Sequence, residues 1–202
     1  MKTKVILISG KKQHGKNTVA RMLTEFATIR GYNVVEVAFA DPLKESAKLL
    51  FRLTDKQVYG THEKEEMDGR WGLTPREILQ KLGTEVGRAI HPDVWVRNLC
   101  YRIIEQKFDK TCPAPTMVLV TDCRFPNEIE VPRQILENVL TIRVNRPGMA
   151  PTAFDSHPSE TALDSYNNFD YYVENDGDFA SLRDVCKTIV DEIYLTLDKE
   201  NV

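Results

Sequence analysis

The strongest constraint on how this chain can fold is an apolar run that ends in a glycine-rich turn and continues into a helix-like segment. Residues 4–9, KVILIS, are continuously apolar with β-branched side chains, which is typical of a strand buried on both faces. After GKKQHGKNT at residues 10–18, apolar side chains recur at helical spacing until Gly31, a natural helix stop. Strand, glycine turn and helix in this order are the opening unit of a parallel α/β sheet.

The glycine turn nearly matches G-x-x-x-x-G-K-[S/T], the pattern of a phosphate-binding loop. Gly10 and Gly15 allow backbone N–H groups to approach phosphate oxygens, and a helix beginning near Lys16 adds the positive end of its dipole. Lys16 supplies a cation for the β and γ phosphates. Asn17 stands where Ser or Thr would hold magnesium, so we expect weak coordination by its amide oxygen, directly or through water. Thr18 is one position late but suited to hydrogen-bond a phosphate.

An ordinary turn with a surface lysine is the alternative interpretation of this loop. It does not account for both glycines together with the adjacent Lys11 and Lys12. We therefore predict an ATP-binding set of Gly10, Lys11, His14, Gly15, Lys16, Asn17, Thr18 and, from a later turn, Arg146.

Strands and helices alternate along the rest of the chain. Further strands are predicted at 33–40, 116–122, 138–144 and 169–175, and helices at 43–52, 74–90, 92–107, 127–137 and 179–197. Thr74 and Glu77 predict a capping box, and Pro132 predicts a kink or break. The polar stretch 55–74 reads as a solvated excursion or as a flexible element over a site. The alternation predicts an α/β fold with a five-stranded parallel sheet covered on both faces, whose ligands bind beyond the carboxyl ends of the strands.

Charged residues follow the predicted strand at 116–122. Asp122 is in the usual position of the acidic residue that holds magnesium, directly or through water, with a helix cap as the alternative. Arg124 is suited to a bidentate grip on phosphate, and Glu128 comes four residues later. Further on, SHPSE supplies His157 and Glu160, and a lone loop histidine is more often a surface residue than a base.

A second group of polar residues follows the predicted strand at 33–40. Asp41 and Lys44 lie at its carboxyl end, where Asp41 is equally suited to cap the next helix. Helical spacing places Arg76, Gln80 and Thr84 on one face, which suits a phosphate and a nucleobase edge, or else a solvated helix face.

Composition limits the class of partner. Of the 202 residues, 28% are charged, the net charge is −3, and the chain therefore lacks the basic excess of a protein that coats nucleic acid. The four cysteines show neither CxxC spacing nor a zinc-like cluster, which favours thiols in a reducing compartment. The start, MKTKVILISG, has too short an apolar run for a signal peptide or a membrane span. We expect a cytoplasmic protein without a nucleic-acid or membrane partner.

The ordered set GKKQHGKNT, ADPLKE, LQKLGTEVG with DVW, VTDCRFPNE, RVNRPG and SHPSE resembles the bacteriophage deoxynucleoside monophosphate kinases, over about residues 5–162. That family looks like a divergent branch of the P-loop nucleoside monophosphate kinases, and it tends to carry Asp where this chain has Asn17. The change loses a charge at that position.

The resemblance implies a three-layer P-loop kinase fold, with the whole chain, 1–202, as one domain. It implies a helical acceptor-binding insertion at about 53–110 and a lid at about 146–162. The implied reaction transfers the γ-phosphoryl group of ATP, with Mg²⁺, to a deoxynucleoside monophosphate. The implied catalytic residues are Lys16, Asp122 and Arg124, with metal contacts from Asn17 and Asp122. The substrate-binding set is Asp41, Lys44, Arg76, Gln80, Gly83, Thr84, Trp95, Asp122, Arg124 and Glu128.

Three alternatives stay open at this point. The chain is a deoxynucleotide kinase, a P-loop kinase of the dephospho-coenzyme A or phosphomevalonate type, or a nucleotide-binding module without transfer activity. The sequence ranks neither the four acceptor bases nor ribose against deoxyribose. It leaves a homodimer open, and the host cytoplasm is the expected location for a protein of phage origin.

Overall fold

The computed structural model describes residues 3–105, 114–149 and 158–199. The chain forms two compact units. The sheet unit comprises Met1–Ala38 with Ile103–Val202, and the helical unit comprises Phe39–Arg102.

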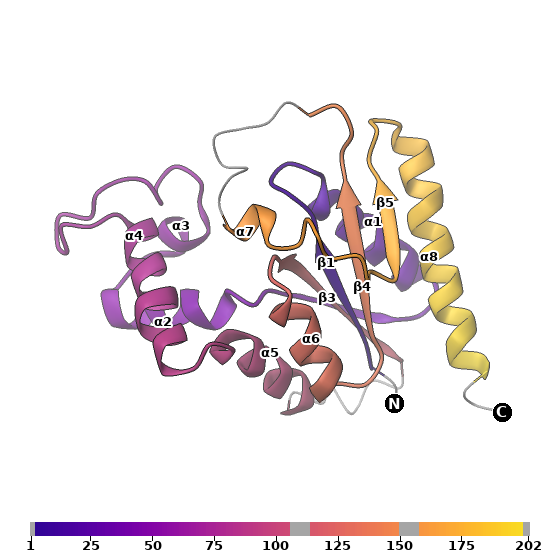
Figure 1. Cartoon of the computed structure of the whole chain (residues 1–202), viewed down its shortest axis with the longest axis horizontal. Helices are drawn as coiled ribbons and strands as arrows, with labels where there is room; N and C mark the ends of the chain where they lie inside the picture. Colours follow the sequence, from indigo (N-terminus) through magenta and orange to yellow (C-terminus); the bar gives the residue numbers. More distant parts are fainter. Residues whose placement is uncertain (1–2, 106–113, 150–157, 200–202) are drawn as a thin grey trace. The chain divides into compact units, whose positions relative to one another are not determined.

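The sheet unit is built on five parallel strands (Figure 1). They are β1 (Thr3–Ser9), β2 (Asn33–Val37), β3 (Thr116–Cys123), β4 (Val139–Asn145) and β5 (Tyr171–Glu174), in the order β2-β3-β1-β4-β5. The predicted five-stranded parallel sheet is confirmed. In the centre, Leu7 of β1 pairs with Val120 on one side and Thr141 on the other. Residues 5–8 are at most 1% exposed, as expected for a strand covered on both faces.

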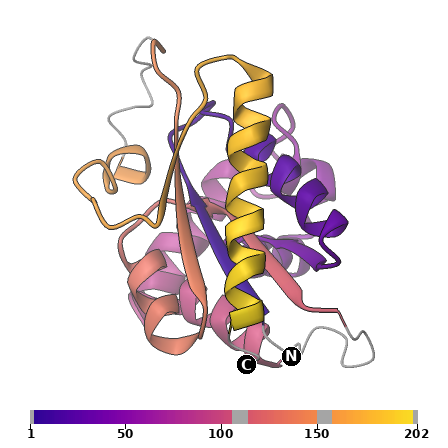
Figure 2. The ribbon, with the colours of Figure 1, turned by 90° about the vertical axis from the view of Figure 1, so that its right-hand side faces the viewer.

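Helices cover both faces of this sheet. Helices α1 (Lys16–Ile29) and α8 (Phe179–Lys199) pack against one face, and α6 (Asn127–Ile135) lies on the other (Figure 2). The core between α1, α8 and the strands includes Ile6, Leu23, Leu119, Ile142, Val173 and Ile189. Helix α6 continues past Pro132 to Ile135, because a proline there removes only one intrahelical hydrogen bond from a short helix that β4 supports.

The helical unit contains α2 (Asp41–Phe51), α3 (Asp55–Tyr59), α4 (Pro75–Gln80), the π-helix η1 (Lys81–Arg88) and most of α5 (Val94–Glu105). Its apolar centre consists of Ala47, Leu53, Val58 and Ile78. The predicted capping box at α4 is confirmed, since the Thr74 hydroxyl accepts from the Glu77 N–H and the Glu77 carboxylate accepts from the Thr74 N–H at 2.8 Å. Within the described ranges, no helix is long and apolar enough to cross a bilayer.

Residues 55–74 are mostly exposed, as a solvated excursion predicts, but they are also partly ordered. They begin with α3, which has its own capping box between Thr54 and Gln57 and contributes the buried Val58 to the apolar centre. A turn then forms around Asp68, whose carboxylate accepts from Arg70 and, at 3.0 Å, from the Gln57 side chain. The polar composition reflects side chains that pair with one another.

Two further predictions, one about a helix and one about a strand, need correction. The segment 74–90 is an α-helix only to Gln80 and then continues as a π-helix, so Arg76, Gln80 and Thr84 do not share one uninterrupted α-helical face. The strand predicted over 33–40 ends at Val37, and Ala40 takes the N-cap position of α2. Asp41 therefore lies in the first turn of α2, where a negative charge is favourable, and is not the N-cap residue.

Leu119→Ala is expected to lower the free energy of unfolding by about 2–5 kcal/mol, because the change opens a cavity in a fully buried central strand. Leu49→Ala is the matched control on α2, where the leucine is 73% exposed, and should change this free energy by less than about 0.5 kcal/mol. Urea denaturation followed by circular dichroism measures both. Equal losses in the two variants would contradict the assignment of Leu119 to the core.

Candidate active site

The glycine loop leaves β1 under tight steric limits. A side-chain carbon on Gly10 would lie 2.5 Å from the Val144 carbonyl oxygen of β4, so only glycine fits without movement. Gly15 has φ 96° and takes the N-cap position of α1 in the left-handed conformation. Both glycines that the motif requires therefore stand where another residue would clash or be strained.

The N-terminus of α1 is open to an anion. No side chain caps it, and its first turn contains no acidic residue. The N–H groups of a first helical turn have no intrahelical partners, and the helix dipole favours negative charge there. Asn17 is exposed and Thr18 half-buried in this turn. The loop and helix together have the form of a phosphate cradle.

Lys16 bends back over this cradle. Its ammonium donates to the carbonyl oxygens of Gly10 at 2.6 Å and Lys11 at 2.8 Å. Burial lowers the pKa of Lys16 to about 8, and the positive charges of Arg124 and Arg143 lower it as well. The opposing charges of Glu160 and Asp122 raise this pKa.

Four charged groups of the sheet unit therefore act on the charge of Lys16, and two of them, Arg124 and Glu160, pair with each other. The structure brings together Lys16, Asp122 and Arg124, which the sequence placed in one site. Their catalytic roles stay a prediction.

The turn after β3 is held by Glu128. The buried Glu128 carboxylate accepts from the main-chain N–H of Arg124 at 2.7 Å and of Phe125 at 3.1 Å. Asp122 does not cap a helix, because Pro126 takes the N-cap position of α6. Glu128 thus fixes the main chain from which the Arg124 side chain extends, and its predicted contact with substrate stays a prediction.

The sequence analysis did not identify Arg143 of β4 as a residue of this site. Its guanidinium donates to the Ser9 hydroxyl at 3.0 Å and to Asp164 at 2.9 Å, and Asp164 also pairs with Lys11 at 2.8 Å. One signal was available, because Arg143 is the single charged residue in the apolar run 139–144, and strand alternation turns it away from the buried Ile142 and Val144. Asp164 carried no such signal.

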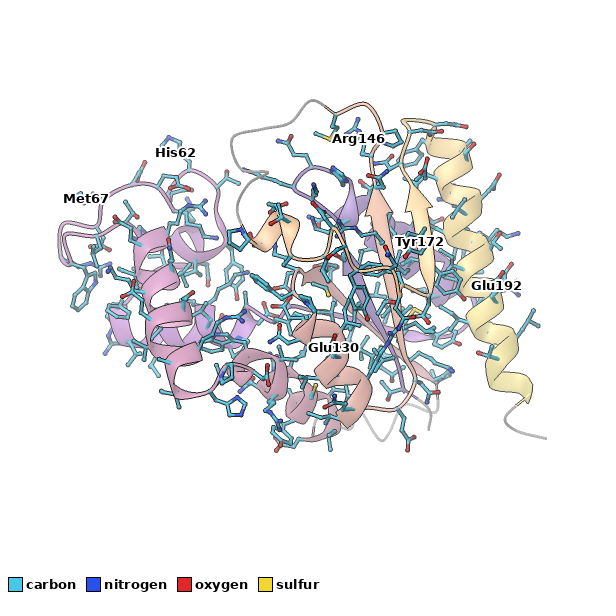
Figure 3. All side chains as sticks on the ribbon, in the orientation of Figure 1. His62, Met67, Glu130, Arg146, Tyr172 and Glu192 are labelled. Carbon is cyan, nitrogen blue, oxygen red and sulfur yellow. The ribbon has the colours of Figure 1, made fainter. Side chains whose placement is uncertain are left out.

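His14 connects the loop to the ends of β4 and β5. Its Nδ1 accepts from the Arg146 N–H at 3.2 Å, and its carbonyl accepts from the Asn175 side chain at 3.0 Å. Burial lowers the pKa of His14, and nearby Lys16 adds to this effect, which favours the neutral ring that an acceptor needs. The Arg146 side chain is exposed at the end of β4 (Figure 3). Residues 150–157 of the predicted lid, His157 among them, lie outside the described residues.

The helical unit holds a second group of cations. Lys44 lies 4.5 Å from the centre of the Tyr59 ring, and Arg76 pairs with Glu65. Lys64, which the sequence did not single out, is half-buried. Burial lowers the pKa of Lys64, and the charges of Lys44 and Arg76 lower it further. Three cations therefore lie near one another, an arrangement that suits a small anion.

The other predicted acceptor residues have packing contacts within the helical unit. The Trp95 indole N–H donates to the Gly83 carbonyl at 2.9 Å. A side-chain carbon on Gly83 would lie 2.8 Å from Leu43, so this glycine allows α2 and η1 to approach closely. Gln80 and Thr84 are exposed. That these residues line a nucleotide site stays a prediction.

Comparison with known proteins identifies the family. The sequence profile described as deoxynucleotide monophosphate kinase matches residues 63–186. A putative deoxynucleotide monophosphate kinase of Acanthamoeba polyphaga mimivirus is 36% identical over 183 residues, covering 85% of this chain and 88% of that protein. The deoxynucleoside-5'-monophosphate kinase of Escherichia phage T5 is 32% identical over 127 residues, covering 54% of this chain and 48% of the phage protein.

Among solved structures, a gluconokinase from Sinorhizobium meliloti 1021 is similar with a TM-score of 0.47 and 13% identity, over 98% of each chain. The family assignment rests on sequence, because the profile spans more than half of the chain and the mimivirus relative matches most of it. The chain belongs to the deoxynucleotide monophosphate kinase family.

Proposed function

We propose that this protein transfers the γ-phosphoryl group of ATP to a deoxynucleoside 5′-monophosphate, giving the diphosphate and ADP. The observation that carries the proposal is the half-buried Lys16 in a glycine loop, with Asp122 and Arg124 close enough to act on its charge. The names of the mimivirus and phage relatives support a deoxynucleotide acceptor over dephospho-coenzyme A or phosphomevalonate. Family membership also favours an enzyme over a binding module.

The reaction needs alignment and charge neutralisation more than a base. An acceptor phosphate oxygen is already anionic at neutral pH, so no proton has to be removed before attack. Lys16 and Arg124 would stabilise the charge on the phosphoryl oxygens, and the first turn of α1 would hold the donor phosphates. Alignment of two bound substrates can supply roughly 7–11 kcal/mol of the barrier.

Mg²⁺ is the metal expected with ATP. It keeps several waters and is bound through one or two carboxylates together with substrate phosphates. The residues present fit that mode. Asp122, the last residue but one of β3, is close enough to Lys16 to influence its pKa, and Asn17 adds an amide oxygen in the first turn of α1. The ion, when bound, would neutralise charge on the transferring phosphates.

The acceptor phosphate is assigned to the cations of the helical unit. A nucleotide monophosphate carries nearly two negative charges at neutral pH. The half-buried Lys44 and Lys64 and the exposed Arg76 place positive charge close together, and a bound dianion would relieve the repulsion that Lys44 and Arg76 exert on Lys64. Exposed Gln80 and Thr84 remain available for the nucleoside.

The expected homodimer and cytoplasmic location stay predictions.

The first test incubates the protein with Mg·ATP and each deoxynucleoside monophosphate, with dephospho-coenzyme A and phosphomevalonate as rival acceptors. A deoxynucleoside diphosphate, identified by mass, is the expected product. Lys16→Ala should lower kcat by at least about 10²-fold, because a positioned charge is lost at the phosphates. Lys187→Ala on exposed α8 is the matched control. Product from a rival acceptor alone, or wild-type rates in Lys16→Ala, would refute the assignment.

The pH dependence of kcat/KM for ATP should show an alkaline limb near pH 8. Lys16 is cationic below its pKa of about 8, so above it the value should fall about tenfold per pH unit. The effect of rising pH on the free energy of unfolding has the opposite sign to its effect on kcat/KM. Between pH 8 and 10.5 the unfolded chain holds this proton more tightly, so the Lys16 contribution to folding becomes more favourable as pH rises. Activity loss that merely follows thermal unfolding in the same buffers would contradict this explanation.

Lys64→Met removes the charge of Lys64 and keeps much of its apolar stem. The KM for the deoxynucleotide should rise about tenfold while the KM for ATP stays constant, because one charged contact to a phosphate is worth about that much. Thermal stability should not fall, since the charge is half-buried beside two like charges. Lys56→Met on exposed α3 is the control. A rise in the KM for ATP alone would place Lys64 outside the acceptor site.

A further inference from the structure

A buried carboxylate in the short helix α7 (Pro158–Thr161) has no part in the proposed chemistry so far. The Glu160 side chain is 6% exposed. Its Oε2 accepts from the Lys12 N–H of the phosphate loop at 2.7 Å, and its Oε1 accepts from Nη1 of Arg124. One side chain therefore joins the loop after β1 to the loop after β3.

Glu160 holds only one edge of Arg124. Nη1 donates to Glu160 and, at 3.5 Å, to the Ser159 carbonyl. Within the described residues, Nε and Nη2 make no hydrogen bond, and the Arg124 side chain is 32% exposed. The guanidinium is thus fixed along one side, and its remaining donors are available for the bidentate contact that a phosphate prefers.

We propose that Glu160 is a positioning residue of the donor site: it locks the Arg124 guanidinium to the phosphate loop, so that the free edge meets the phosphates of ATP. The inference rests on the proposed function, which makes those phosphates the ligand. Glu128 holds the main chain of Arg124, and Glu160 holds the end of its side chain. Arg124 is therefore held at both ends before any nucleotide binds.

The opposite role, a carboxylate that occupies the site and competes with phosphate, fits the contacts less well. A competitor would have to leave when ATP enters, yet Glu160 is almost fully buried and engages only one of the loop's N–H groups among its described contacts. Asp164, four residues on, pairs with Lys11 and Arg143 and anchors the same segment at a second point.

Glu160 also acts on the charge of Lys16. Arg124 and Arg143 lower the pKa of Lys16, whereas Glu160 and Asp122 raise it. Loss of the Glu160 charge should therefore move the alkaline limb of kcat/KM for ATP to lower pH. A residue that only stabilised the fold would leave that limb where it is.

The decisive experiment is a double-mutant cycle on Mg·ATP affinity, measured by titration calorimetry. The four proteins are wild type, Glu160→Gln, Arg124→Ala and the double variant. Glu160→Gln should weaken binding about tenfold, because a charge-assisted contact that orients the guanidinium is lost. At a pH well below the Lys16 pKa of about 8, where Lys16 stays cationic, the same change in the Arg124→Ala background should have almost no further effect on affinity, since Glu160 then acts through Arg124.

Glu130→Gln is the matched control, because Glu130 is exposed on α6 (Figure 3). If Glu160→Gln fails to fold, Glu160→Asp keeps the charge but is too short to reach both Lys12 and Arg124, and it should weaken binding in the same way. Tighter ATP binding in Glu160→Gln would instead identify a competitor, and losses that add across the cycle would show that Glu160 does not act through Arg124. Either result overturns the proposal.

The cycle separates this inference from the proposed function. A wild-type protein that makes no diphosphate but shows coupled losses of ATP affinity would disprove the transfer reaction and leave the role of Glu160 standing. Diphosphate formation together with losses of ATP affinity that add across the cycle would support the transfer reaction and disprove the role of Glu160. A folded wild-type chain that does not bind Mg·ATP would reject both.

Discussion

The close approach of the glycine loop to β4 is the constraint on which the donor site depends. Because β1 lies between β3 and β4, its carboxyl end brings Gly10 so near the Val144 carbonyl that no side chain fits. The carbonyls of Gly10 and Lys11 hold the Lys16 ammonium, and α1 starts where the loop ends. The position of the cation follows from the packing of the central strands.

Crowded positive charge in a half-buried site is costly unless it is compensated, and the sheet unit compensates it with carboxylates from a distant part of the sequence. Glu160 meets Arg124, while Asp164 meets both Lys11 and Arg143. Such pairing fixes donors in place before substrate arrives, so that little reorganisation is needed when charge develops on a phosphoryl group. Glu160 and Asp164 therefore belong to the proposed donor site together with the glycine loop.

The parts of this fold that local pattern determines could be predicted from the sequence. Continuous apolar runs located β1 and β3 to within a residue, and Thr74 with Glu77 located the start of α4. The π-helix η1 could not be foreseen, because no local signal separates it from the helix that continues α4. The contacts of Asp164 and Asn175 were equally hidden, since residues far apart in the sequence meet only once the parallel strands are ordered.

The two cation groups differ in a way that suits the substrates assigned to them. In the sheet unit, carboxylates lie among the cations, and a triphosphate that arrives with its own Mg²⁺ needs oriented donors more than extra charge. In the helical unit, Glu65 pairs with Arg76, but burial and two neighbouring cations still depress the pKa of Lys64. A monophosphate without a metal needs that surplus of positive charge, because its own dianion is otherwise uncompensated. Under the proposed assignment, the charge balance of each unit therefore matches what its substrate lacks.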